Sequence, residues 1–321
     1  MATGTETAFD VSAKPKTGTP YDDAFRTLLV DCPELVIPLI NEAFGEHYVR
    51  NEKVTVHHNE FFIVGDDKRE TDSHISIRQK KYHVECQSTV DGTMMIRLFE
   101  YDAQVAIEDV VQKKNEVIFT FPHTAVMYLR SNKNTPSRMR VIIKVPGDSV
   151  GYEVPVVKVP EYTLEEIMDK ELYFLIPFHL FRYEKELGIY ENDKERLEEL
   201  RETYGQIVEY LNRKMKEDNL TALQCWVIQE TTKKVAENLA VHHKKVQEGV
   251  TETMGGQILE LECVKRWNAG IEAGREEGKF QGILSTLNDL VKDGVLTVAE
   301  AARRVSMTEE DYVEQIKQLG L

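Results

Sequence analysis

The sequence predicts an α/β fold in which helices flank a mixed sheet, followed by a mainly helical carboxyl-terminal region. Apolar residues recur at helical spacing over residues 22–44, so the fold is expected to begin with helices. The pattern changes to period two over residues 54–87, which is typical of half-buried strands. From residue 163 onward the periodicity is almost entirely helical.

The first helices are expected to follow a short unstructured segment. Residues 1–20 are rich in Thr, Lys, Gly and Pro and offer little apolar surface to bury, so we predict a disordered lead-in. Pro33 interrupts the helical pattern of residues 22–44, and proline suits the first turn of a new helix. Two short helices are therefore predicted, the second with a kink at Pro38.

Consecutive antiparallel strands are predicted between Val54 and Gln87. Polar turn candidates at residues 66–68 and 78–81 separate the period-two segments. Residues 61–64 form an apolar run that is expected to be a buried strand.

A helix is predicted from the break at Asp91-Gly92 to about Lys114. Its buried stripe is expected to consist of Ile96, Phe99, Ala103, Ala106 and Val110. A second face carries Arg97, Tyr101, Gln104 and Glu108. Further strands are predicted at residues 117–121, 124–129 and 141–145, with an extended stretch to Val159.

The chain is expected to divide into an α/β domain over residues 21–180, a helical appendage over residues 181–290 and a helix pair over residues 291–321. The appendage is strongly charged, and Asp218-Asn219 is expected to separate two of its helices. Glycine recurs every four residues at positions 270, 274, 278 and 282. This spacing fits either a helical stripe for close packing or a charged linker.

The last two helices are expected to begin at Thr297 and Thr308, because threonine is a favoured N-cap. Two interpretations of this pair are open. One is a helix-turn-helix that binds DNA over residues 296–319. The other is packing or homo-oligomerisation through the helical carboxyl-terminal region, which we prefer because the final helix is acidic and suits phosphate badly.

The charge and the cysteines limit the classes of function. The formal charge is −15 at pH 7, so DNA binding would need a local basic patch or bridging metal ions. Four cysteines lie far apart without CxxC pairing, which predicts reduced thiols and neither a zinc site nor a disulfide framework. Neither a targeting pattern nor a membrane-spanning window is found, and we expect a cytoplasmic protein without membrane contact.

Two acidic residues on neighbouring predicted strands are the strongest candidates for chemistry. A hairpin turning near Gln79 would bring Asp72 beside Glu85, so that both carboxylates could bind one metal ion. The hard ions Mg²⁺ and Mn²⁺ favour such oxygen ligands, supplemented by a main-chain carbonyl, for which Cys86 is the candidate. Gln87 projects to the same side as Glu85 and could orient the attacking water, but an amide cannot act as a general base.

Three segments resemble a known family. The segments ETDSHISI, YHVECQS and MIRLFEYD are similar to the Rpn family of recombination-promoting nucleases and transposases, a branch of the PD-(D/E)xK superfamily. An early Asp-x-x-Phe-Arg pattern at residues 22–26 and the run LYFLIPF at residues 172–178 extend the resemblance over residues 21–180. The resemblance implies a restriction-endonuclease-like α/β core and metal-dependent cleavage of DNA.

The resemblance also implies roles for single residues. Asp72 matches the first acid of the superfamily and Glu85 the second, while Gln87 stands where many members have lysine. Arg97 and Tyr101 match an R-x-x-x-Y helix, in which Arg97 could contact phosphate bidentately. The catalytic set is therefore expected to be Asp72, Glu85, Gln87, Arg97 and Tyr101.

Two further acids and a histidine complete the candidates. Glu70 is a candidate for an additional metal ligand. Asp22 is either a metal ligand from the first helix or simply the N-cap of that helix. Among the histidines at 57, 58, 74 and 83, His83 is favoured because it shares a strand face with Glu85.

Two functions follow from these expectations. The first is a Mg²⁺- or Mn²⁺-dependent DNA endonuclease that acts in recombination or transposition. The alternative is a catalytically inactive nuclease fold that serves a mobile element as a DNA-binding or protein-interaction module.

Overall fold

The computed structural model describes most of the chain between residues 19 and 318. The described residues are 19–57, 60–63, 67–70, 73–89, 92–255, 284, 287–288, 291–292, 296–305 and 307–318, with the backbone alone for 60–63, 67–70, 310 and 318. The chain forms two compact units, Met1–Glu260 and Leu261–Leu321, which we describe separately. Residues 1–18, which make up most of the predicted lead-in, lie outside the described residues.

Short helices open the first unit, as predicted. Helix α1 (Pro20–Asp31) is followed by the 3₁₀ helix η1 (Pro33–Val36) and by α2 (Ile37–Phe44). The interruption at Pro33 is confirmed. The helix predicted after it changes from 3₁₀ to α at Ile37, so that Pro38, where a kink is predicted, lies in the first turn of α2. Helix α2 ends at Gly45, whose φ of 67° is the left-handed cap that glycine adopts without strain.

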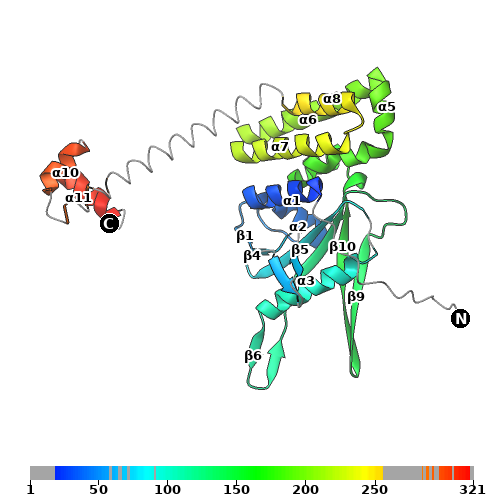
Figure 1. Cartoon of the computed structure of the whole chain (residues 1–321), viewed down its shortest axis with the longest axis horizontal. Coiled ribbons are helices and arrows are strands. Elements are labelled where there is room, and N and C mark those ends of the chain that lie inside the picture. Colours follow the sequence, from blue (N-terminus) through cyan, green and yellow to red (C-terminus); the bar gives the residue numbers. More distant parts are fainter. Residues whose placement is uncertain are drawn as a thin grey trace. The chain divides into compact units, whose positions relative to one another are not determined.

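A six-stranded mixed sheet forms the centre of this unit (Figure 1). Strands β5 and β8 occupy the middle and run parallel, as do β8 and β10, whereas the remaining neighbours are antiparallel. In spatial order the strands are β1 (Val54–Val56), β4 (Ile75–Ile77), β5 (Lys80–Gln87), β8 (His123–Tyr128), β10 (Asp148–Lys158) and β9 (Arg138–Val145).

Two small hairpins stand apart from this sheet. Strand β2 (Glu60–Ile63) pairs with β3 (Asp67–Glu70), and β6 (Val111–Lys113) pairs with β7 (Glu116–Ile118). Residues 54–87 therefore do not form one series of consecutive strands, because β1 pairs directly with β4. The helix predicted to reach Lys114 ends at Glu108, since the β-branched pair at residues 110–111 and the turn at 114–115 favour a hairpin.

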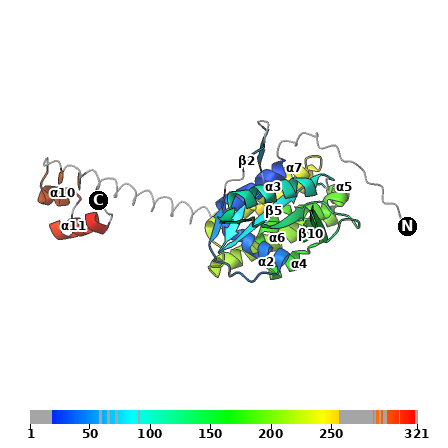
Figure 2. The ribbon, with the colours of Figure 1, turned by 90° about the horizontal axis from the view of Figure 1, so that it is seen from below.

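Helix α3 (Met94–Glu108) covers one face of the sheet, and α2 lies on the other (Figure 2). The buried stripe of α3 consists of Met94, Leu98, Tyr101, Asp102, Val105 and Ala106. The predicted stripe is therefore only partly right: Ala106 is buried and Phe99 and Ala103 are half-buried, but Ile96 is 39% exposed. Tyr101 and Asp102 point inward instead. Met94 and Leu98 of this stripe pack against Val126, Tyr128 and Val154 of the sheet.

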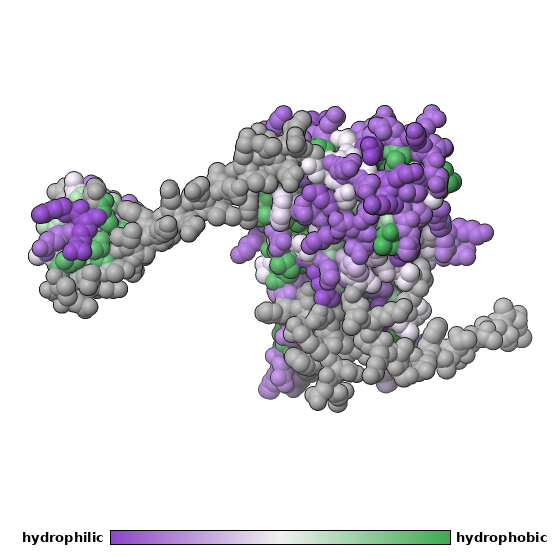
Figure 3. All heavy atoms as spheres, turned by 45° about the horizontal axis from the view of Figure 1, so that its top comes forward, coloured by the Kyte–Doolittle hydropathy of each residue, from purple (hydrophilic) through white to green (hydrophobic). Residues whose placement is uncertain are grey.

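A layer of helices completes the unit above the sheet in Figure 1. It contains α7, which packs against α1 and η3, and α6, which packs against α8. The outer surface of this layer is mostly hydrophilic (Figure 3). Its elements are η2 (Val159–Glu161), α4 (Leu164–Asp169), η3 (Tyr173–Glu186), α5 (Leu187–Asn192), α6 (Lys194–Lys216), α7 (Ala222–Leu239) and α8 (Lys244–Met254).

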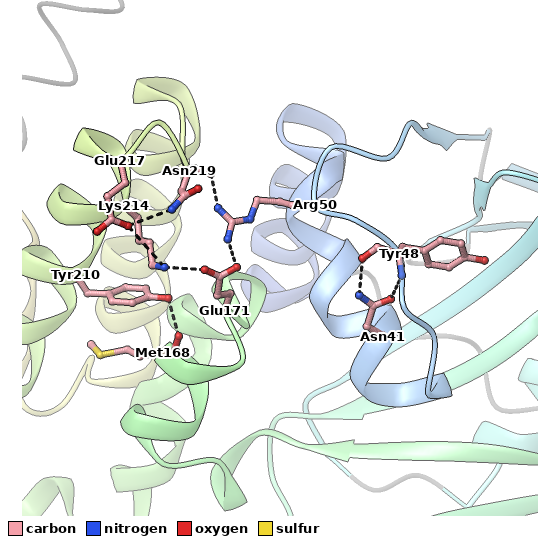
Figure 4. Close-up of polar contacts among 9 residues, drawn as sticks. All are labelled: Asn41, Tyr48, Arg50, Met168, Glu171, Tyr210, Lys214, Glu217 and Asn219. Atoms are coloured by element: carbon pink, nitrogen blue, oxygen red, sulfur yellow. Dashed lines mark hydrogen bonds and ion pairs between the residues drawn. The ribbon is translucent and has the colours of Figure 1, made fainter.

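Polar contacts join this layer to the segment before the sheet (Figure 4). Glu171 forms ion pairs with Arg50, which precedes β1, and with Lys214 of α6, whose Nζ lies 2.7 Å from the carboxylate. Arg50 also donates to the carbonyl oxygen of Asn219 at 3.0 Å. The predicted break between α6 and α7 is confirmed there, with Asp218 at a φ of 55°.

The second unit contains α10 (Val298–Arg304) and α11 (Glu309–Gln318). Thr297 caps α10 by a capping box with Glu300, and the Thr308 hydroxyl accepts from the amide of Asp311, so both predicted starts are confirmed. Leu284, Leu287, Ala301, Ala302, Tyr312 and Ile316 form its core. The glycine repeat at residues 270–282 lies outside the described residues. No helix in the described ranges is long and apolar enough to cross a bilayer.

Candidate functional site

The predicted hairpin that carries the candidate acids is present. Strands β4 and β5 are antiparallel, with Ile75 opposite Tyr82, and the turn consists of Arg78 and Gln79. Arg78 has a φ of 55°, a left-handed backbone conformation that is strained for a residue with a side chain. Beyond the last ladder pair, the Ser73 hydroxyl lies 2.7 Å from both the amide nitrogen and the carbonyl oxygen of Val84. Asp72 itself lies outside the described residues.

Glu85 and Gln87 lie on one face of β5, as predicted. The Gln87 amide donates to Glu85 Oε1 at 3.5 Å, whereas Cys86, between them, points into the core and is 1% exposed. Strand β5 is central in the sheet, so Glu85 is only 5% exposed. A carboxylate at this depth requires polar partners.

His83 supplies one of these partners. Its Nε2 lies 3.3 Å from Glu85 Oε2, and its Nδ1 lies 2.9 Å from Asp102 Oδ1. The imidazole is 1% exposed and stands between two carboxylates. The face shared by His83 and Glu85, which made this histidine the favoured candidate, is confirmed.

Asp102 is the residue that the sequence reasoning missed. It is fully buried in α3, and its carboxylate accepts hydrogen bonds from three different elements. Besides His83, the hydroxyl of Thr124 on β8 donates at 2.7 Å, and that of Tyr152 on β10 at 3.1 Å. The available signal was its position one helical turn after Leu98, on the face that contacts the sheet.

The two carboxylates determine the charge state of His83. Burial by itself lowers the pKa of this imidazole, but the hydrogen bonds and charges of Asp102 and Glu85 outweigh burial and raise the pKa to about 9. His83 is therefore an imidazolium at neutral pH. Both ring nitrogens then act as donors, one toward each carboxylate.

Helix α1 brings a second carboxyl group toward Glu85. Thr19, and not Asp22, is the N-cap. Asp22 is the third residue of the helix, and in the capping box its carboxylate accepts from the Thr19 amide at 2.6 Å. Burial raises the pKa of Asp22, the bonds to Thr19 oppose this, and the negative charge of Glu85 raises it further. Of the two roles predicted for Asp22, that of N-cap is wrong, while that of metal ligand stays a prediction.

The predicted phosphate-binding pair of α3 lies close to this cluster. Tyr101 is buried, and its ring meets the His83 ring edge-on with centroids 5.9 Å apart. Arg97, one turn earlier, is half-buried, with Nη2 3.9 Å from the sulfur of Met94. Tyr101 thus packs against His83, the histidine that contacts Glu85.

The other candidates lie elsewhere or are not described. The backbone of Glu70 belongs to β3, and its side chain lies outside the described residues, as does His58. The rings of His57 and His74 are tilted against each other with centroids 4.6 Å apart, and His57 Nε2 lies 2.7 Å from the Ser76 hydroxyl. Burial, reinforced by neighbouring positive groups, lowers the pKa of His74 to about 4, so this ring is neutral at pH 7.

The described side chains of the site do not by themselves form a complete metal-binding site. Within the described residues, no three His, Cys, Asp or Glu side chains are placed so that they could hold one ion. The cluster of Glu85, His83, Asp102 and Gln87, with Asp22 nearby, is a carboxylate–histidine network on the central strand of the sheet.

Fold and site together define an α/β protein with a six-stranded mixed sheet, flanking helices and a buried acidic cluster beneath α3. Comparison with known proteins adds no relative. No protein-family model, no curated protein and no solved structure matches this chain.

Proposed function

We propose that the chain is a metal-dependent DNA endonuclease with a restriction-endonuclease-like core, similar to the Rpn branch of the PD-(D/E)xK nucleases. The observation that supports this best is the position of Glu85. It lies on a central strand, in contact with His83 and Gln87, and a second carboxyl group, that of Asp22, is close enough for its pKa to respond.

The donors around Glu85 suit a hard divalent cation. Oε1 of this carboxylate accepts a hydrogen bond from Gln87 and Oε2 accepts one from His83, and carboxylate oxygens are ligands that such an ion prefers. Asp72, Glu85 and the carbonyl of Cys86 would hold Mg²⁺ or Mn²⁺, with Asp22 and Glu70 as additional ligands. When bound, such an ion polarises the scissile phosphate and lowers the pKa of a coordinated water.

The remaining steps belong to the side chains. Gln87 would orient the attacking water by hydrogen bonding, since its amide cannot accept a proton from it. Arg97 would bind the phosphate, and Tyr101 would support this arginine from the adjacent turn. Where many nucleases have a lysine this chain has Gln87, and the buried His83 supplies a positive charge beside Glu85.

A plasmid-nicking assay tests this function. Full-length protein with Mg²⁺ or Mn²⁺ should convert supercoiled DNA to nicked circles, and Asp72→Asn and Glu85→Gln should lose this activity while keeping the far-ultraviolet circular dichroism of the wild type. Glu42→Gln is the matched control, because Glu42 is a carboxylate of α2 that accepts from the Tyr162 hydroxyl at 3.2 Å, outside the cluster.

Two results would reject the proposal. One is DNA that stays intact with either ion at any protein concentration tested. The other is nicking that persists unchanged in Glu85→Gln, which would indicate a contaminating nuclease. Specific DNA binding without cleavage would instead favour the inactive module of a mobile element.

A further inference from the structure

The buried pair of Asp102 and His83 has no direct part in the proposed cleavage. Asp102 is fully buried and His83 is 1% exposed, so substrate in solvent reaches neither side chain. Burying an aspartate costs several kcal/mol unless it is hydrogen-bonded and paired. A buried carboxylate with a complete set of partners calls for a structural or functional reason.

Asp102 is held from three directions. Its Oδ1 accepts from His83 at 2.9 Å and from Thr124 at 2.7 Å, and its Oδ2 accepts from Tyr152 at 3.1 Å. These donors belong to β5, β8 and β10, three adjacent strands of the sheet. The carboxylate of Asp102 is therefore fixed relative to the sheet as well as to α3.

A fixed Asp102 in turn fixes His83. A carboxylate at Nδ1 requires a proton on that nitrogen and sets the plane of the imidazole ring. The ring is further confined by the edge of Tyr101, 5.9 Å away between centroids. Its Nε2 is then directed at Glu85 Oε2, 3.3 Å away.

We propose that Asp102 and His83 are positioning residues that hold the Glu85 carboxylate in the orientation needed to bind a divalent cation. The proposal rests on the proposed function, because it assumes that Glu85 is a ligand. Without His83, Oε2 of Glu85 would lose the hydrogen bond that fixes its direction. Partners of this kind, which orient a metal ligand through hydrogen bonds, change metal affinity about 10- to 100-fold when they are removed.

Calorimetric titration of the full-length protein with Mn²⁺ tests this inference. Asp102→Asn keeps the shape of the side chain and removes its charge, and we expect the dissociation constant for Mn²⁺ to rise about 10- to 100-fold. Glu42→Gln, the same type of change at a tyrosine-bonded carboxylate outside the cluster, should bind like the wild type. Thermal unfolding of each variant shows whether a change in Mn²⁺ affinity is accompanied by a loss of stability.

A second variant covers the case in which Asp102→Asn does not fold. Tyr152→Phe removes one of the three hydrogen bonds to Asp102 and leaves the ring in place. Since one hydrogen bond contributes about 1 kcal/mol net, we expect a rise of about two- to five-fold in the dissociation constant.

The outcomes separate the two proposals. If the wild type binds Mn²⁺, Glu85→Gln does not, and folded Asp102→Asn binds as tightly as the wild type, the positioning role is wrong and the proposed ligand role of Glu85 stands. Unchanged affinity in Tyr152→Phe has the same meaning if Asp102→Asn is unfolded. If the wild type shows no Glu85-dependent binding, the ligand role of Glu85 fails first and the positioning role fails with it.

Discussion

The charge state of His83 predicts how the stability of the first unit depends on alkaline pH. In the unfolded chain this imidazole has its ordinary pKa of 6.5, and in the folded protein the pKa is about 9. Between these two values the folded protein binds one proton more than the unfolded chain. The stabilisation is therefore complete below pH 6.5 and is lost as the pH rises through about 9.

The size of this effect follows from the interval between the two pKa values. At about 1.4 kcal/mol per pH unit, the interval corresponds to about 3 kcal/mol of unfolding free energy. Urea unfolding at intervals between pH 6 and pH 9.5 measures it, and His83→Gln is the reference because glutamine does not titrate. The reasoning is refuted if wild type and variant lose stability in parallel over this range, or if the wild type loses none.

Two further predictions concern other parts of the chain. His179 is buried in η3, where burial and the charge of Arg182 lower its pKa to about 4. The folded protein cannot take up this proton until the pH falls below that value, so unfolding free energy should fall between pH 6.5 and pH 4, by about 3 kcal/mol more in the wild type than in His179→Leu. Equal acid slopes in the two proteins would contradict this. In the second unit, Thr297→Ala removes the N-cap of α10 and should destabilise that helix by about 1 kcal/mol. Faster amide hydrogen exchange confined to the second unit is the expected readout, and unchanged exchange would show that the cap contributes nothing.

Local patterns predicted the elements that carry the candidate site. The period-two segments and the polar residues at 78–81 were sufficient for the β4–β5 hairpin, because a two-residue turn fixes its register. Alternation along β5 then placed Glu85 and Gln87 on one face and Cys86 in the core. The threonine caps of the last two helices were found for a similar reason, since capping depends on neighbours in sequence.

Contacts between distant elements could not be found in this way. The stripe predicted for α3 was chosen for hydrophobicity, whereas the buried face includes Asp102, whose burial is compensated by Thr124 and Tyr152, 22 and 50 residues away. The β6–β7 hairpin was missed because residues 110–113 continue a helical pattern while their β-branched residues favour a strand. The partners of Asp102 lie outside the window in which a periodicity is read, whereas the hairpin was a local choice between two competing patterns.

The helical layer limits how the chain can be shortened. The sequence predicts a domain boundary after residue 180. In the structure, however, α7 lies against both α1 and η3, and Lys214 of α6 and Arg50 both form ion pairs with Glu171. A protein cut at that point would lose α7 from α1, a helix whose Phe25, Leu28 and Leu29 are fully buried in the intact chain. Such a fragment should aggregate, and the smallest independently folding form of the first unit should extend through α8 to about residue 255.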